Sequence, residues 1–328
     1  MKKFYEKSKI NKKVDKNICP CQFTNTRADK NQMVDFIKVA DELNRHLIDG
    51  NDDGLLKITA RYKTAERQEI SNAFQAHHGR VISEAIKMYC KKGPFQSLMS
   101  MAWEPYPEMK AQNLTTLMKG GKNPKAICDY ILTTNPDEWD YITRYYQNST
   151  GRDLSNDLLQ ELGSKTFWAR LCLSWIAFRR APRNDPAGDA EALRVALSGK
   201  KADEDAVVQL LGTTTPDEWA RISKAFEIST SRTVHDCMRT VFKGNDLTAA
   251  HTAHHFLNNA NEGAAYLIFR AVEEKGDVER CARATAMYYD KCPHVKLNYA
   301  IFGNLARDIR RVFKSNFGEA CCTMWGVL

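Results

Sequence analysis

Apolar side chains recur at spacings of three and four residues along much of this chain, and the clearest pattern occurs twice. The first copy is Trp139, Ile142 and Tyr146, and the second, 80 residues later, is Trp219, Ile222 and Phe226. Residues at these spacings lie on one face of a helix. The strict alternation of apolar and polar residues that is typical of a strand is nearly absent. The sequence therefore predicts an all-α protein that contains a duplicated helix.

Each copy of this helix is preceded by a segment with the features of a helix start. Residues 133–139 read Thr-Thr-Asn-Pro-Asp-Glu-Trp, and residues 213–219 read Thr-Thr-Thr-Pro-Asp-Glu-Trp. Asn135 and Thr215 can cap the helix, and the proline that follows suits the first helical position. Glu138 and Glu218 stand at the third helical position, which predicts a capping box at both starts. Such a repeated segment indicates duplicated units.

The register of the two copies extends to a third unit, 72 residues before the first copy. Ile70 and Phe74 stand where the first copy has Ile142 and Tyr146. The turn that follows aligns in all three units as Gly79-Arg80, Gly151-Arg152 and Ser231-Arg232. A fourth unit has the right length and a helical pattern, although its sequence is degenerate. The predicted organisation is a basic flexible tail at 1–32 and four units at 33–104, 105–182, 183–260 and 261–328.

Within one unit the pattern predicts five short helices. In the second unit these are expected at about 107–118, 124–132, 136–148, 152–162 and 166–178. Glycine-rich or polar breaks separate them, such as Lys-Gly-Gly-Lys-Asn at 119–123. In the third unit a helix is expected from about 187, and proline-containing loops at 104–107 and 181–186 separate the units.

Composition and charge narrow the possible partners. Hydrophobic residues make up 43% of the 328 residues, enough for a sizeable core, and no apolar run is long enough to span a membrane. The ten cysteines show no framework spacing, which indicates reduced thiols in an intracellular protein. The net charge of +8 favours an anionic partner. The tail is strongly basic, with lysines at positions 2, 3, 7, 9, 12, 13 and 16.

Four units of five short helices resemble the core of the annexin family. Residues 66–74 with Gly79-Arg80 are similar to the third helix and following turn of a typical first annexin repeat. Residues 151–154 and 157–162 are similar to the fourth helix of a second repeat. The divergence is most like the protist α-giardin branch. The resemblance implies a curved disc of four repeats, whose convex face carries interhelical loops that meet the membrane through calcium.

The resemblance also implies where calcium ligands should lie. Annexins use the loop after the first helix, Lys-Gly-x-Gly-Thr, together with an acid about 40 residues further on. In the second unit the loop positions are Met118, Gly120 and Lys122, and Glu161 is the distant acid. Lys122 replaces the second glycine of the family pattern. The positions equivalent to Glu161 in the first and third units are Tyr89 and Val241, so at most one imperfect site of this type is expected.

The first unit has a different loop after its first helix. Asp49, Gly50, Asp52 and Asp53 give it an acidic character. Two interpretations are equally open: a local calcium site, or a solvated turn rich in aspartate and glycine. We therefore expect calcium as a cofactor at few sites.

Basic residues occupy the same loops in every unit. They are Lys91, Lys92, Lys119, Lys122, Lys165, Lys200, Lys201, Lys243 and Lys275, with Lys314 near the last loop. If these loops share one face, the lysines form a docking surface for anionic lipid. The alternative is that lysines simply occur on every exposed loop.

Catalytic motifs are not found, so we do not expect an enzyme. The leading hypothesis is an annexin-like peripheral protein that binds anionic phospholipids through its loops, with weak or partial calcium dependence. The alternative is a cytoskeletal adaptor that binds microtubules or other filaments through the basic tail and surfaces, as the resemblance to α-giardins implies. Nucleic acid is not an expected partner. The expected localisation is cytoplasmic, peripheral at the plasma membrane or the cytoskeleton.

One pair of histidines leaves two interpretations open. His251 and His255 are four residues apart on a predicted helix, a spacing that can chelate zinc. No third ligand is evident in the sequence, which favours an ordinary helix edge instead.

Overall fold

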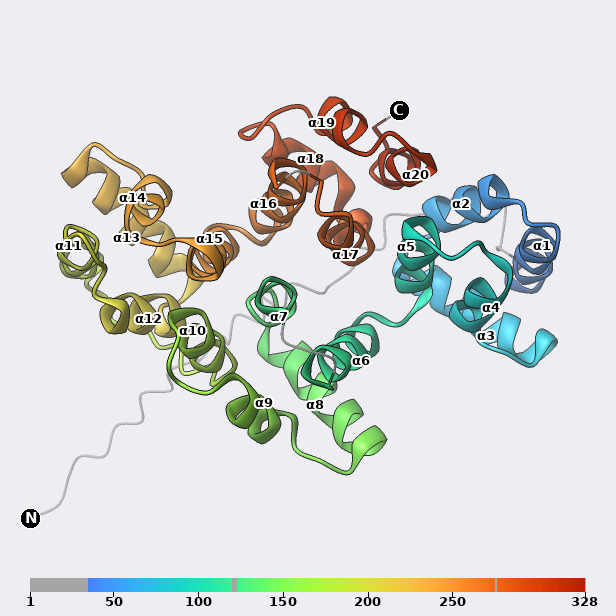
Figure 1. The fold of residues 1–328 in the computed structure, drawn as a ribbon, viewed down its shortest axis with the longest axis horizontal. Helices are drawn as coiled ribbons and strands as arrows, with labels where there is room; N and C mark the ends of the chain where they lie inside the picture. Colours follow the sequence, from blue (N-terminus) through green and yellow to red (C-terminus); the bar gives the residue numbers. More distant parts are fainter. Residues whose placement is uncertain (1–34, 120–122, 275, 328) are drawn as a thin grey trace, which may run out of the picture. The chain divides into compact units, whose positions relative to one another are not determined.

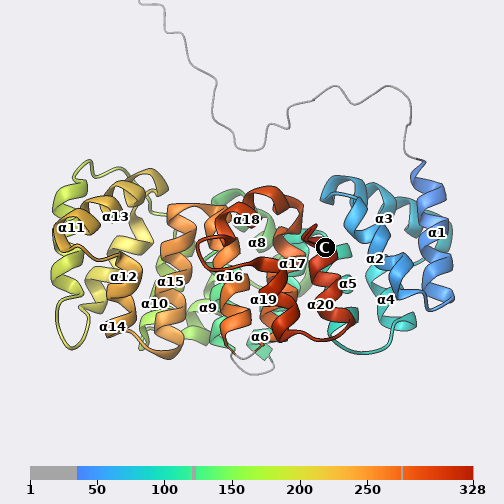
Figure 2. The same cartoon turned by 90° about the horizontal axis from the view of Figure 1, so that it is seen from above.

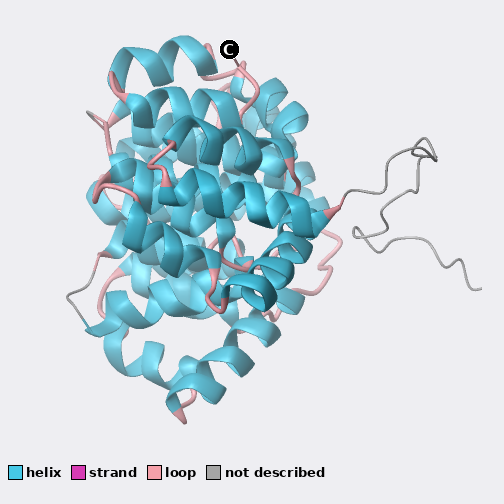
Figure 3. Cartoon of the chain, turned by 90° about the vertical axis from the view of Figure 1, so that its right-hand side faces the viewer, coloured by secondary structure: helices cyan, strands magenta, loops and turns pink. Residues whose placement is uncertain are grey.

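The computed structural model describes residues 35–119, 123–274 and 276–327. All the helices given below lie in one compact unit, residues 36–328. The predicted flexible tail at 1–32 lies outside the described residues. Within the described ranges the chain forms helices and loops and no strands, so the all-α prediction is confirmed (Figure 3).

The described helices fall into four consecutive groups of five, which we call repeats 1 to 4 (Figure 1). Repeat 1 comprises α1 (Phe36–Ile48), α2 (Asp52–Arg61), α3 (Thr64–His78), α4 (Ile82–Tyr89) and α5 (Pro94–Trp103). Repeat 2 comprises α6 (Tyr106–Lys119), α7 (Pro124–Ile131), α8 (Pro136–Thr150), α9 (Leu154–Leu162) and α10 (Phe167–Ile176). Repeat 3 comprises α11 (Pro186–Ala196), α12 (Glu204–Thr213), α13 (Pro216–Thr230), α14 (Val234–Val241) and α15 (Gly244–Asn258). Repeat 4 comprises α16 (Ala260–Glu273), α17 (Val278–Tyr288), α18 (Cys292–Tyr299), α19 (Leu305–Val312) and α20 (Asn316–Met324), with a 3-10 turn η1 (Tyr289–Lys291) before α18.

The five helices predicted for repeat 2 agree with the structure to within two residues at each end. The helix expected from about 187 begins at Pro186. The linker expected at 104–107 is shorter, because α6 already begins at Tyr106. We keep the unit boundaries given above as our proposed division of the chain.

The third helix of each repeat has a distinct place. It packs against the first helix in every repeat, as the pairs α1 with α3, α6 with α8, α11 with α13 and α16 with α18. Figure 2 shows the third helices along the upper side of the helical unit, and the connections after the first and fourth helices along its lower side. We call the connection after the first helix of a repeat its first loop, and the connection after the fourth helix its fourth loop.

The helix starts predicted for the repeated segment are present. The Asn135 side chain accepts a hydrogen bond from the Glu138 backbone N–H at 2.8 Å, and Thr215 Oγ1 accepts one from Glu218 N–H at 3.4 Å. The apolar face that follows is buried, and Trp219 is completely inaccessible.

The predicted role of the two glutamates is wrong. Neither carboxylate returns to the N-cap backbone in the described structure. Glu138 instead accepts a hydrogen bond from the buried Lys110 ammonium at 3.3 Å. Glu218 accepts hydrogen bonds from the backbone N–H groups of Arg183 at 2.6 Å and Asn184 at 2.8 Å. The glutamates therefore connect the third helix to the segment that starts each repeat.

The two threonines of the repeated segment also accept hydrogen bonds from a positively charged side chain. In repeat 2, Lys110 Nζ donates to Thr133 Oγ1 at 3.2 Å and to Thr134 Oγ1 at 2.8 Å. In repeat 3 the Arg183 guanidinium donates to Thr213, at 2.8 Å, and to Thr214. Lys110 is buried and requires such partners, because an unpaired buried charge would be costly. The repeated segment is thus a helix cap and a cation-binding element at once.

The third helices of repeats 1 to 3 end at one conformationally demanding position. Gly79, Gly151 and Ser231 occupy it with φ angles of 68°, 71° and 53°. This left-handed conformation suits glycine and costs a residue with a Cβ atom about 1 kcal/mol or more. The alignment of these three turns in the sequence is confirmed, with repeat 3 carrying the unfavourable residue.

Replacing Ser231 by glycine should stabilise the protein by about 1 kcal/mol, because it removes the left-handed penalty. The matched variant is Gly151→Ser, which should destabilise the protein by a similar amount. A Cβ atom at position 151 would meet nothing within 4 Å, so the substitution changes only the conformational energy of the backbone. Urea unfolding of the three proteins measures both effects. Equal stability of all three would contradict the conformational explanation.

A buried ionic cluster joins repeats 2 and 4. The Asp129 carboxylate on α7 accepts hydrogen bonds from Arg280 at 2.7 Å and from Arg283 at 3.0 Å, both on α17. The Asp129 and Arg280 side chains are at most 1% exposed. Repeats 1 and 4 are joined in a similar way, since Arg67 on α3 pairs with Asp290 at 3.1 Å and lies over the Tyr289 ring.

Asp129→Asn should destabilise the protein by about 3–5 kcal/mol, because it leaves two buried arginines without their counter-ion. Asp140→Asn is the control. Asp140 pairs with Arg144 on the exposed surface, where both side chains are more than 60% accessible, and an exposed pair contributes little. Urea unfolding should separate the two variants clearly. A loss for Asp129→Asn no larger than that for Asp140→Asn would rule out a structural role for the cluster.

Candidate functional site: the loop face

The first and fourth loops lie on the same side of the helical unit (Figure 2). We call this side the loop face. The described lysines predicted there are all exposed: Lys91, Lys92, Lys119, Lys165, Lys200, Lys201, Lys243 and Lys314. Lys122 and Lys275 lie outside the described residues. The loops that carry the predicted lysines are therefore brought to one side, from all four repeats.

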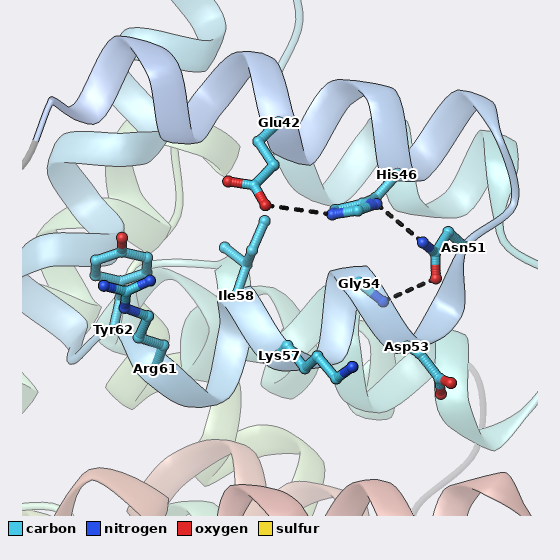
Figure 4. Close-up of a pocket in the computed structure, with 9 residues that line it drawn as sticks. All are labelled: Glu42, His46, Asn51, Asp53, Gly54, Lys57, Ile58, Arg61 and Tyr62. Carbon is cyan, nitrogen blue, oxygen red and sulfur yellow. Dashed lines mark hydrogen bonds and ion pairs between the residues drawn. The ribbon is translucent and has the colours of Figure 1, made fainter.

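The first loop of repeat 1 is a well-defined turn. Gly50 adopts the left-handed conformation with φ of 64°, and the Asn51 side chain caps α2 by accepting from Gly54 N–H at 2.9 Å. Asn51 also bonds to His46 at 3.1 Å. The His46 ring lies against Gly54, where a Cβ atom would come within 2.4 Å of it. Figure 4 shows these contacts at one end of a groove of about 520 Å³ between α1 and α2, with Asp53 pointing away from them.

The acidic residues of this loop differ in their surroundings. Asp49 and Asp53 are exposed, whereas Asp52 is half-buried. Burial, with a smaller effect of the Asp53 charge, raises the pKa of Asp52. Burial and the charge of Asp52 raise the pKa of the Cys90 thiol to about 11. The charge of Asp52 on the first loop thus acts on Cys90, the residue at which the fourth loop of the same repeat begins.

The predicted calcium position in repeat 2 is described only in part. Glu161 is half-buried in the last turn of α9, and Met118 is half-buried in the last turn of α6. Gly120 and Lys122 lie outside the described residues. The Asn123 side chain ends this loop by capping α7 through Ala126 N–H at 3.1 Å. The Glu161 carboxylate and the Met118 end of the loop thus lie at the ends of α9 and α6, the two helices that the family pattern implies.

Whether a repeat can supply a distant carboxylate depends on the residue at one position of its fourth helix. Glu161 is the eighth residue of α9, and the eighth residues of α4, α14 and α19 are Tyr89, Val241 and Val312. In repeat 4, a Cβ atom on Gly276 would come within 2.8 Å of Val312 Cγ1. An apolar side chain therefore fills the space beside the first loop that a carboxylate would need. Because the sequence of repeat 4 is degenerate, this position could not be aligned from the sequence alone.

The first loop of repeat 3 closes on itself. The Asp203 backbone N–H donates to the Ala196 carbonyl at 2.9 Å, and a Cβ atom on Gly199 would lie 2.9 Å from the Lys201 carbonyl oxygen. With Val241 opposite, this loop has carbonyl oxygens and lysines but no carboxylate at the eighth position. Across the described residues, no three histidine, cysteine or acidic side chains form a group that could hold a metal ion.

Both interpretations of His251 and His255 are wrong. The residues are 3% and 4% exposed, so they do not form a helix edge. Their rings belong to a buried cluster with His235 and Tyr266 rather than to a metal-holding group. Sequence reasoning missed His235, which lies on a different helix.

Comparison with known proteins decides the family. The model of the fourth repeat of annexin E1 matches residues 264–326. Giardin subunit alpha-4 of Giardia intestinalis is 31% identical over 290 residues, which cover 88% of this chain and 97% of the relative. This chain belongs to the annexin family, among the α-giardins. Giardin subunit alpha-3 of the same organism is 28% identical over 88% of this chain and 98% of its own length.

Solved structures agree with the α-giardin assignment. The crystal structure of calcium-bound alpha-1 giardin superposes with a TM-score of 0.82 at 26% identity, covering 90% of this chain and all of that one. Chicken annexin V superposes with a TM-score of 0.77 at 19% identity, over 89% and 96% of the two chains, and shows the shared fold. The predicted fold class, a four-repeat annexin-like disc, is confirmed. Of the helices in the described ranges, none has the length and apolarity that crossing a membrane requires.

We propose that Glu161 is the main calcium carboxylate of this α-giardin. Glu161→Gln should then remove most of the calcium-dependent gain in stability, because ligand binding to the folded state stabilises it by mass action. Asp52→Asn tests the local site of repeat 1 in the same way, and Asp140→Asn on the exposed surface of α8 is the control. Urea midpoints with calcium and with chelator give the measurement. An unchanged calcium response in Glu161→Gln would refute the assignment.

Proposed function

We propose that this α-giardin binds anionic phospholipid membranes through its loop face, with only partial dependence on calcium. The observation that carries the proposal is the set of exposed lysines on loops that all four repeats present on one side. Calcium-bound structures among the relatives support a contribution from calcium. Peripheral attachment to a membrane or to the cytoskeleton is the localisation that follows.

Charge alone is sufficient for docking. A lysine near an anionic bilayer contributes roughly 1 kcal/mol, so four or five of the described loop-face lysines would hold the protein without calcium. This attraction decays over a Debye length and weakens in salt. Calcium adds less than in a protein with four complete sites, because the eighth-position carboxylate occurs only at Glu161 among the four described positions.

Co-sedimentation with anionic vesicles tests the proposal. Binding should persist in chelator at low salt, and should fall in high salt or with zwitterionic vesicles. A variant carrying Lys200→Glu and Lys243→Glu should bind at least tenfold more weakly in chelator, since two attractive charges become repulsive. The control carries Lys224→Glu and Lys296→Glu, exposed lysines of the third helices α13 and α18 on the opposite side.

Two outcomes would overturn this function. Complete loss of vesicle binding in chelator at low salt would show that the lysines do not dock the protein. Equal losses in the loop-face variant and the control would show that net charge acts without a defined face. A parallel set of samples contains microtubules in place of vesicles. If the protein sediments with microtubules and never with vesicles, the cytoskeletal adaptor is favoured instead.

A further inference from the structure

Repeat 3 contains a cluster of four histidines. His235 lies on α14, and His251, His254 and His255 lie on α15; together they are half of the eight histidines in the chain. The His235 and His251 rings stack with their centroids 3.8 Å apart, and the His254 and His255 rings are 4.9 Å apart. The three on α15 are at most 5% exposed.

These histidines occupy positions that another repeat fills with ordinary core residues. The 80-residue register places His251 and His255 at the positions of Leu171 and Trp175 in repeat 2. Leu171 and Trp175 are buried. Buried positions that hold leucine and tryptophan in repeat 2 therefore hold titratable side chains in repeat 3.

The partners of the rings fix which nitrogens carry protons. Trp219 Nε1–H donates to His254 Nδ1 at 3.1 Å, and indole nitrogen can only donate. His251 Nε2 lies 3.0 Å from the His235 backbone carbonyl, which can only accept, so Nε2 carries the proton. His251 Nδ1 is then bare and accepts from the Tyr266 hydroxyl at 3.0 Å.

The fourth ring completes the same scheme. His255 Nδ1 lies 2.6 Å from the Glu262 carboxylate and donates to it. His255 Nε2 is then bare and accepts from His235 Nδ1–H at 3.0 Å. His251 and His255 thus each have one bare nitrogen at which a donor points.

His254 faces donors at both nitrogens, Trp219 at Nδ1 and the Asn258 amide nitrogen 3.4 Å from Nε2. Trp219 Nε1–H can only donate, so protonating His254 Nδ1 would set two donors against each other and break that hydrogen bond. Protonating His251 or His255 would place a positive charge inside the buried cluster.

We propose that this cluster is an acid-sensitive latch, which holds α14 on α15 and α15 on α13 at neutral pH and releases α14 when the rings are protonated. At neutral pH these rings connect α15 to three neighbouring helices. His235 with its carbonyl ties α14 to α15, and Trp219 ties α13 to α15. Tyr266 and Glu262 tie α16 to the same rings.

The direction of the pH response follows from burial. Burial lowers the pKa of His254 and His255 well below the usual histidine value, and neighbouring histidines lower them further. Burial likewise lowers the pKa of His251 and of His235. An unfolded or released histidine titrates near pH 6.5. The latch is therefore fully closed above about pH 6.5, and each proton taken up on opening raises the open fraction about tenfold per pH unit below it.

The surrounding charges do not cancel this effect. Acidic and basic side chains face the cluster from three of the helices packed around it: Glu227 on α13, Asp236 and Arg239 on α14, and Glu262, Arg270 and Glu273 on α16. Glu262 is the one acid in hydrogen-bond contact with a ring, and burial raises the pKa of Glu262. It can compensate one positive ring, whereas each of the four rings in the cluster can take up a proton.

The released element is short and locally attached. α14 has eight residues and packs mainly on α15 and α13 of its own repeat. Its buried face consists of Val234, Cys237 and Met238. Opening the latch would expose this apolar face and free the fourth loop with Lys243, whereas α4 and α9, the equivalent helices of repeats 1 and 2, would stay closed.

Hydrogen exchange of the full chain, without lipid, tests the latch independently of the proposed membrane function. Between pH 7.5 and about 5.5, after correction for intrinsic rates, amides of α14 should lose about 10- to 100-fold more protection than those of α9. The range corresponds to one or two protons taken up on opening. Equal losses in α14 and α9 would overturn the proposal without any variant.

Variants assign the effect to the rings. Glutamine accepts and donates as the neutral rings do and takes up no proton, so the triple variant His251→Gln, His254→Gln, His255→Gln should keep α14 protected at both pH values. The single variant His254→Gln, which keeps an acceptor for Trp219, should lower the loss, and serves if the triple variant does not fold. His77→Gln with His294→Gln, at exposed positions, should leave the wild-type loss intact. Acid sensitivity that persists in the His254→Gln variant undiminished would contradict the latch.

Discussion

The arrangement of the repeats depends most on the buried carboxylate of Asp129. It lies on α7 of repeat 2 and is held by Arg280 and Arg283 of repeat 4, more than 150 residues further along the chain. Charges removed from water this completely are tolerated only while they are paired. Hydrogen bonds are also directional, so the cluster fixes how the two repeats face each other more narrowly than apolar packing does. The Arg67–Asp290 pair joins repeat 1 to repeat 4 in the same manner.

Because the repeats share one helix order, their first and fourth loops emerge on one side, and small sequence differences decide what each loop can bind. The eighth residue of the fourth helix illustrates this. It is Glu161 in repeat 2, and in repeat 4 it is Val312, which packs on Gly276. The same helix position thus holds a carboxylate in one repeat and an apolar side chain in another, while lysines recur in the loops of all four repeats. The α-giardin relatives place the chain in a family with calcium-bound members, and we propose that the loops of this chain rely more on charge than on calcium.

The sequence was sufficient for the helices and for the register of repeats 1 to 3, because both rest on local signals. Apolar spacing, the capping residues Asn135 and Thr215, and the turns at Gly79 and Gly151 act within a few residues. What a side chain does across repeats was not predictable. Glu138 was expected to cap its own helix and instead meets Lys110, and the cluster around His251 depends on His235 from another helix. Such contacts depend on how the helices pack, which the spacing of residues along the sequence does not show.

Lysine acetylation with and without anionic vesicles, in chelator, identifies the docking residues themselves. Docking through the loop face predicts that vesicles protect Lys91, Lys165, Lys200 and Lys243, and leave Lys224 and Lys296 on the third helices as reactive as in solution. Protection of the third-helix lysines, or of no lysine in either set, would contradict docking through the loop face.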